Sequence, residues 1–88
     1  MTNKNILTPK VFKELAEARS IRNVSIYSAE QGLIIVARVG LSDKILGKDR
    51  GGIRYFKSFD GAAAILQKYG INEWEANSEN WVPRTTKK

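Results

Sequence analysis

The sequence has 88 residues, of which 42% are hydrophobic and 27% are charged, an ordinary composition for one small globular domain. It contains no cysteine and no histidine, which excludes disulfides, the commonest zinc sites and histidine acid–base catalysis. The formal net charge is +6, and the positive excess is concentrated in residues 38–57 and 80–88. Such polarised charge predicts a partner with an acidic surface, such as nucleic acid, anionic lipid or an acidic protein.

Neither a secretion signal nor a membrane span is predicted. The first seven residues lack the apolar core of a signal peptide, and the longest apolar run, 33–37, is too short to cross a bilayer. We therefore expect a cytoplasmic protein with no membrane partner. One domain is expected over residues 8–82, with flexible termini at 1–7 and 83–88.

A first helix is predicted from Pro9 to about Ser20. Thr8 supplies an N-cap hydroxyl, and proline is suited to the first helical turn. Apolar residues then recur at helical spacing and should face the core. This expected stripe consists of Val11, Phe12, Leu15, Ala16 and Ala18.

From residue 21 the apolar pattern changes to alternation, which predicts a β-hairpin of strands 21–27 and 33–39. Residues 29–32 supply the turn between them. The second strand is apolar on both faces and rich in β-branched residues, so we place it in the interior of the sheet. Further short strands are expected at 44–48 and, after a glycine loop, at 53–57.

A second helix should begin after Ser58, with Asp60 in its first turn and Gly70 at the left-handed position beyond its end. A last short strand at 71–77 surrounds Trp74. The order α-β-β-β-β-α-β predicts an α+β class: a single small domain with a mostly antiparallel sheet and two helices packed on one face. The other face would be solvated or would form a partner surface. The expected stripe of the second helix is Phe59, Ala62, Ala63, Leu66 and Tyr69.

The segment 50–57 alternates cations with aromatic side chains, as surfaces that neutralise phosphates and stack bases do. A glycine turn between two edge strands, kept soluble by lysines and arginines, would give the same pattern. The Walker spacing of a phosphate loop is absent, which argues against a nucleotide-binding enzyme. The predicted nucleic-acid or partner-binding residues are Arg38, Lys44, Lys48, Arg50, Arg54, Tyr55 and Lys57, with Phe56 as an alternative stacking group.

Carboxylates cluster after the second helix, where a strand would place Glu73 and Glu75 on the same face. They could act as an acid–base pair or hold a hard cation, but solvated side chains of an edge strand are the preferred interpretation. We expect no catalytic residue, no metal and no cofactor.

Trp74 or Trp81 should cap the core. The basic tail 84–88 would add electrostatic affinity or solubility.

One series of residues carries a family resemblance. It reads Arg50-Gly51-Gly52-x-Arg54-x-Phe56-x-Ser58-x-Asp60-x-Ala62-Ala63-x-x-Leu66-x-x-x-Gly70-Ile71. With the helix, hairpin and apolar strand before it, this series resembles the small partition-associated, ParC-like accessory proteins of bacterial plasmids and conjugative elements. The similarity covers residues 8–77. Gly61, inside the first turn of the helix, and the basic tail depart from the family pattern.

The resemblance implies a mobile-element protein that acts beside a partition ATPase or its DNA site, without catalysis. Our leading hypothesis is a non-enzymatic accessory protein that binds nucleic acid nonspecifically through a basic face, in partition or transfer. The alternative is a protein-interaction module, either a partition-ATPase adaptor or an inhibitor of a CRISPR-type host defence nuclease complex. A free edge strand at 53–57 or 73–77 would allow a homodimer.

Overall fold

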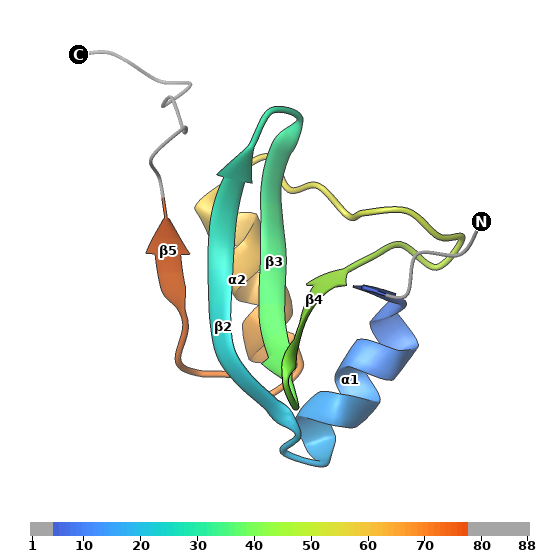
Figure 1. Cartoon of the computed structure of the whole chain (residues 1–88). Coiled ribbons are helices and arrows are strands. Elements are labelled where there is room, and N and C mark those ends of the chain that lie inside the picture. Colours follow the sequence, from blue (N-terminus) through green and yellow to red (C-terminus); the bar gives the residue numbers. More distant parts are fainter. Residues whose placement is uncertain (1–4, 78–88) are drawn as a thin grey trace.

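The computed structural model describes residues 5–77, which form one five-stranded sheet and two helices (Figure 1). The α+β class is confirmed. The basic tail and Trp81 lie outside the described residues, so the expectations for them stay predictions. The elements are β1 (Ile6–Leu7), α1 (Pro9–Glu17), β2 (Ile21–Ala29), β3 (Gly32–Val39), β4 (Ser42–Leu46), α2 (Phe59–Lys68) and β5 (Glu75–Asn77).

The strand order in the sheet is β1-β4-β3-β2-β5, with β3 in the centre as predicted. The strands β2, β3 and β4 form an antiparallel meander, whereas β1 pairs with β4 and β5 pairs with β2 in parallel. The sheet is therefore mixed, with parallel pairs at both edges. These parallel pairs join distant parts of the chain, as parallel pairing requires, because two parallel strands cannot be joined by a tight turn.

The strand β1 lies in the segment that we expected to fray. Its hydrogen bonds explain why it is ordered: Ile45 N–H donates to Asn5 O and Gly47 N–H donates to Leu7 O, each at 2.6 Å. The outer edge of β4 is therefore hydrogen-bonded to the backbone of residues 5 and 7. These hydrogen bonds hold β1 in place, although β1 has only two residues.

The predicted strand 53–57 forms only two isolated bridges, Gly47–Ile53 and Leu33–Phe56. Arg54 N–H donates to the carbonyl of Leu46 at 3.1 Å, whereas Phe56 exchanges two hydrogen bonds with Leu33, at 2.8 and 2.9 Å. The segment therefore changes partner from the end of β4 to the upper part of β3 within three residues. A continuous ladder cannot form, and this strand prediction was wrong.

Both helix starts agree with the sequence. Val11 N–H donates to the Thr8 hydroxyl at 3.3 Å, and Gly61 N–H donates to the Ser58 hydroxyl at 3.0 Å. Gly70 follows α2 with a positive φ of 84°, a conformation that glycine adopts without steric cost. The local chemistry of the capping residues therefore sets these ends of the helices.

Both helices pack on one face of the sheet. The ring of Phe12 from α1 lies 5.7 Å from the ring of Tyr69, just beyond α2. Phe12 is fully buried, whereas Val11 is 39% exposed, so the buried stripe of α1 is shifted from the one predicted. Trp74 packs against the core, as expected. The buried core consists of Phe12, Val24, Ile26, Leu33, Ile35, Ala37, Leu46, Phe56, Ala62 and Leu66.

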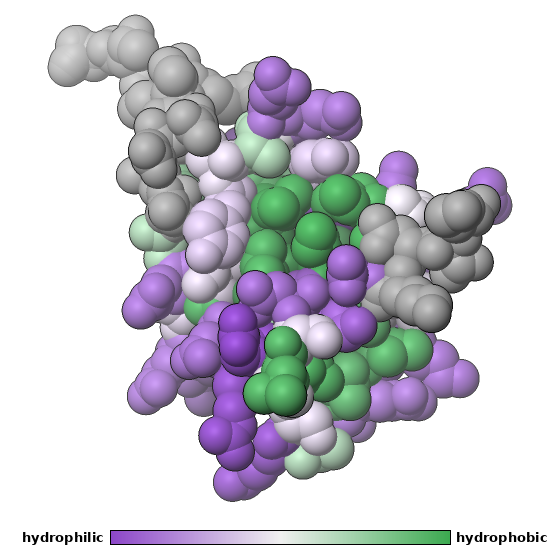
Figure 2. Space-filling model, in the orientation of Figure 1, coloured by the Kyte–Doolittle hydropathy of each residue, from purple (hydrophilic) through white to green (hydrophobic). Residues whose placement is uncertain are grey.

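The opposite face of the sheet, here called the open face, has no described helix over it (Figure 1). Alternate residues of β3 point to this face, because the residues between them are buried on the helix side. Apolar side chains gather over its middle (Figure 2). We call this group the apolar patch; it consists of Ile6, Tyr27, Ile34, Val36 and Ile45.

Candidate nucleic-acid interface

Two arginines meet at one end of the open face. Arg22 of β2 and Arg38 of β3 are directly paired in the antiparallel register. Arg38 follows Val36 by two residues and therefore shares its face, and the cross-strand partner of a residue lies on the same face. The two guanidinium groups thus extend from neighbouring strands on the same side of the sheet.

A β-bulge puts Arg22 on this face. Ile21 packs against the core and Val24 is buried, although residues three apart in a regular strand point to opposite faces. The register shifts between Arg22 and Ser25, and Asn23 has a positive φ of 50°. The extra residue of the bulge reverses the alternation of side chains along β2, so that Ile21 and Val24 both face the core.

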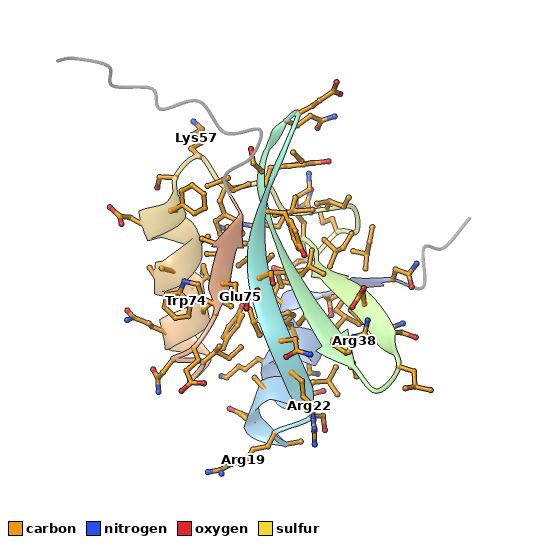
Figure 3. All side chains as sticks on the ribbon, turned by 60° about the vertical axis from the view of Figure 1, so that its left-hand side comes forward. Arg19, Arg22, Arg38, Lys57, Trp74 and Glu75 are labelled. Carbon is orange, nitrogen blue, oxygen red and sulfur yellow. The ribbon has the colours of Figure 1, made fainter. Side chains whose placement is uncertain are left out.

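Arg19 lies at the same end of the molecule as this pair, in the turn after α1. It follows α1 with a positive φ of 60°, which turns the chain into β2. Arg19 and Arg22 line one surface pocket of about 470 Å³, beside Gly70 and Ile71. Figure 3 shows Arg19, Arg22 and Arg38 at the same end of the molecule. We call these three residues the arginine cluster.

Positive charge in the cluster exceeds the negative charge beside it. Arg38 Nε lies 3.2 Å from Asp43 Oδ1, and both side chains are substantially exposed, so this ion pair adds little stability. Neither Arg19 nor Arg22 forms an ion pair with another residue of the described part. Like charges directly opposite each other in a sheet are destabilising. An anion bound between them would remove that repulsion.

The cations predicted from the sequence do not form one surface. Lys44 is paired with the buried Ala37 and so lies on the helix side of β4, opposite to Arg38. Lys48 and Arg50 belong to the turn after β4, and Lys57 lies at the other end of the molecule from Arg38 (Figure 3). Of the predicted set, only Arg38 is in the arginine cluster.

The aromatic part of the predicted site is largely structural. Phe56 is 7% exposed and belongs to the core, so it cannot stack on a base, and this alternative was wrong. The Arg54 guanidinium lies 5.0 Å from the centroid of the Phe56 ring, a cation–π contact that covers the edge of the core. Tyr55 remains accessible, with 37% exposure.

The ParC-like family model matches residues 7–85, nearly the whole chain. The chain belongs to the ParC-like family. Membership confirms the resemblance and relates the protein to plasmid functions. Comparisons with curated proteins and with solved structures gave no match. Among the described residues of this family member, no helix is long and apolar enough to cross a membrane.

Sequence reasoning on this ParC-like chain missed Arg19 and Arg22. A signal was present, because Ile21 and Val24 are both apolar at a spacing that a regular strand cannot bury on one face. An asparagine between them, the residue type that best tolerates positive φ after glycine, marks the bulge. With the bulge in place, Arg22 and Arg38 come onto the same face.

The carboxylates after α2 line a second pocket of about 330 Å³, formed by Asn23, Val24, Glu73, Trp74 and Glu75. Glu75 pairs with Ser25 and thus borders the open face, at the edge strand β5. Within residues 5–77, no group of three or more acidic side chains is arranged to hold a metal ion. The pocket therefore offers this ParC-like protein a mixed polar surface at the edge of the sheet.

Proposed function

We propose that this member of the ParC-like family is a non-enzymatic plasmid accessory protein that binds nucleic acid through the arginine cluster. The observation that carries the proposal is the direct cross-strand pairing of Arg22 with Arg38. The two guanidinium groups repel each other there. A phosphate anion bound between them would attract both. Guanidinium groups suit this role because they bind phosphate in a bidentate manner.

The cluster fits the nucleic-acid backbone better than base edges. Arg22 and Arg38 extend from a broad sheet face and Arg19 from the turn after α1, so the three guanidinium groups are spread over a surface and are not carried on one helix that could enter a groove. Contacts to phosphates position a protein on a duplex but carry no direct sequence information. Binding should therefore be largely nonspecific, with an affinity in the micromolar range or weaker that falls steeply with salt.

The test is fluorescence anisotropy of labelled single- and double-stranded DNA over a salt series, with three double variants. Arg19→Ala/Arg22→Ala alters the cluster, Arg50→Ala/Lys57→Ala alters the segment predicted from the sequence, and Lys10→Ala/Lys13→Ala alters exposed positions of α1. Each removes two positive charges, so all three variants have the same net charge. Only the cluster variant should lose about two units of salt slope, the value for two phosphate contacts.

Equal losses in the three variants would attribute binding to net charge and would contradict the proposal. A loss confined to Arg50→Ala/Lys57→Ala would return the site to the segment 50–57. Absence of binding to either form of DNA at low salt would remove nucleic acid as the partner.

The second candidate is a protein-interaction module, such as a partition-ATPase adaptor or an inhibitor of a host defence nuclease complex. The apolar patch favours it, because a sheet face exposed to water usually carries polar residues. Co-purification with a defined protein partner, together with no affinity for DNA, would select this function.

A further inference from the structure

The apolar patch extends over four strands of the sheet, from β2 to β1. The register pairs Tyr27 with Ile34 on β2 and β3, and Val36 with Ile45 on β3 and β4. Ile45 is in turn paired with Ile6 on β1. Residues paired in this way share a face, so the side chains form a band from β2 to β1. The four aliphatic members are half-buried, and Tyr27 is 41% exposed.

This band contains no charge. The charged residues that the register assigns to the open face lie outside the band: Arg22, Arg38 and Asp43 form one row at one end of the sheet, and Glu75 lies at the β5 edge. An antiparallel sheet with one solvated face alternates apolar and polar residues along its strands. β3 breaks that rule at Ile34 and Val36, where polar side chains would be expected. An apolar centre with a charged margin is the arrangement of a protein–protein interface.

The dimensions of the face suit a small interface. The five strands contain 2, 9, 8, 5 and 3 residues, 27 in all. At a rise of about 3.3 Å per residue and a strand spacing of about 4.8 Å, they cover about 430 Å². Two such faces in contact would bury about 900 Å², the size of a weak, transient interface. A second sheet of the same size would cover the band completely.

We propose that the open face binds a second copy of this chain, sheet to sheet. The two-fold axis lies in the plane between the two sheets and runs perpendicular to the strands. Each copy carries a net charge of +6, so two copies repel unless their cations are kept apart. The stated axis places the arginine end of one copy over the opposite end of the other. The uncharged band then forms the contact, and the two arginine clusters lie at opposite ends of the dimer. This inference is independent of the proposed function.

The dimer should respond to salt in the opposite direction from DNA binding. Salt screens the repulsion between the two positively charged copies and leaves apolar contact intact. Dimerisation should therefore strengthen as the salt concentration rises, whereas phosphate binding weakens. A contact held by acidic groups of a different protein would weaken with salt as well.

The test is sedimentation velocity of the full chain at roughly 5 to 500 μM, at low and high salt, because interfaces of this size are weak. Wild-type protein should dimerise, more tightly at high salt. Val36→Lys should weaken the dimer at least about tenfold, since the charge would be buried in the contact. Leu41→Lys is the matched control: Leu41 is 95% exposed in the turn between β3 and β4, outside the patch, and its substitution should leave dimerisation nearly unchanged.

A second measurement does not depend on a variant that folds. In an NMR dilution series, the amides of 34–36 and 45 should shift with concentration, whereas those of α2, on the other face, should not. A monomer at every concentration would overturn the proposal. Shifts confined to β5 would overturn it in favour of pairing through the sheet edge. If removal of residues 78–88 converts a monomer into a dimer, that tail and not a second copy covers the face in the full chain.

Discussion

The two faces of β3 are both apolar over residues 33–36 but have different surroundings. Leu33 and Ile35 point to the helices and are completely buried, whereas Ile34 and Val36 point to the open face and are half-buried. A strand that is apolar on both faces usually lies between two layers. The difference shows that both faces of β3 are hydrophobic enough to be buried. Within the described residues, only the helix side is covered by a second layer.

The largest expected effect is on the helix side. Ile35→Ala should lower the free energy of unfolding by about 2–5 kcal/mol, because it leaves a cavity in a packed core. Val36→Ala, at a position with no described layer above it, should cost less than about 1 kcal/mol in the monomer. Denaturant unfolding at low protein concentration measures both. Equal costs would mean that the open face is also covered within one chain.

A substitution at Gly32 should disrupt the contact between segment 53–56 and β3. Its φ of 147° is unfavourable for other residues, and an added Cβ would lie 2.9 Å from the carbonyl oxygen of Phe56. That oxygen accepts the hydrogen bond from Leu33 N–H, so the segment 53–56 would be pushed away from β3. Gly32→Ala should destabilise the protein by about 1–3 kcal/mol in thermal unfolding. Gly40→Ala is a useful comparison, since φ is also positive there but no atom lies within 4 Å of the added group.

The smallest expected effect concerns the charged margin of the open face. Arg22→Glu replaces a repulsive pair by an attractive one opposite Arg38, which should stabilise the fold by about 0.2–1 kcal/mol. The same change should weaken DNA binding, because it reverses a charge in the arginine cluster. Arg22→Gln, which only removes the charge, should fall between the wild type and Arg22→Glu in both measurements. A loss of stability in Arg22→Glu would mean that the two arginines do not repel.

Local patterns predicted the elements whose physical causes are local. Thr8 and Ser58 capped their helices as expected, and the alternation after residue 21 gave the central hairpin. The errors arose where a distant partner decides the outcome. Ile6 joins a strand because β4 offers an unpaired edge, and segment 53–57 divides its hydrogen bonds between two strands. Neither fact is visible in the neighbouring residues.

The candidate site was predicted less well, for a related reason. Charge density along the chain pointed to residues 48–57, but Lys57 lies at the other end of the molecule from Arg38. The arginine cluster is assembled from the turn after α1, from β2 and from β3, and it depends on the bulge at Asn23 and on the register of the hairpin. A single displaced residue in β2 would move Arg22 to the other face.

The parallel strands at both edges have a consequence for the order of folding. The meander β2–β3–β4 joins neighbouring stretches of chain and closes short loops, whereas β1 and β5 bring the two ends of the described chain to opposite edges of that meander. Closing the long loops costs more conformational entropy, so these pairings should form last. The hairpin that carries Arg22, Arg38 and the centre of the apolar patch therefore belongs to the part of the molecule expected to form first and to open last.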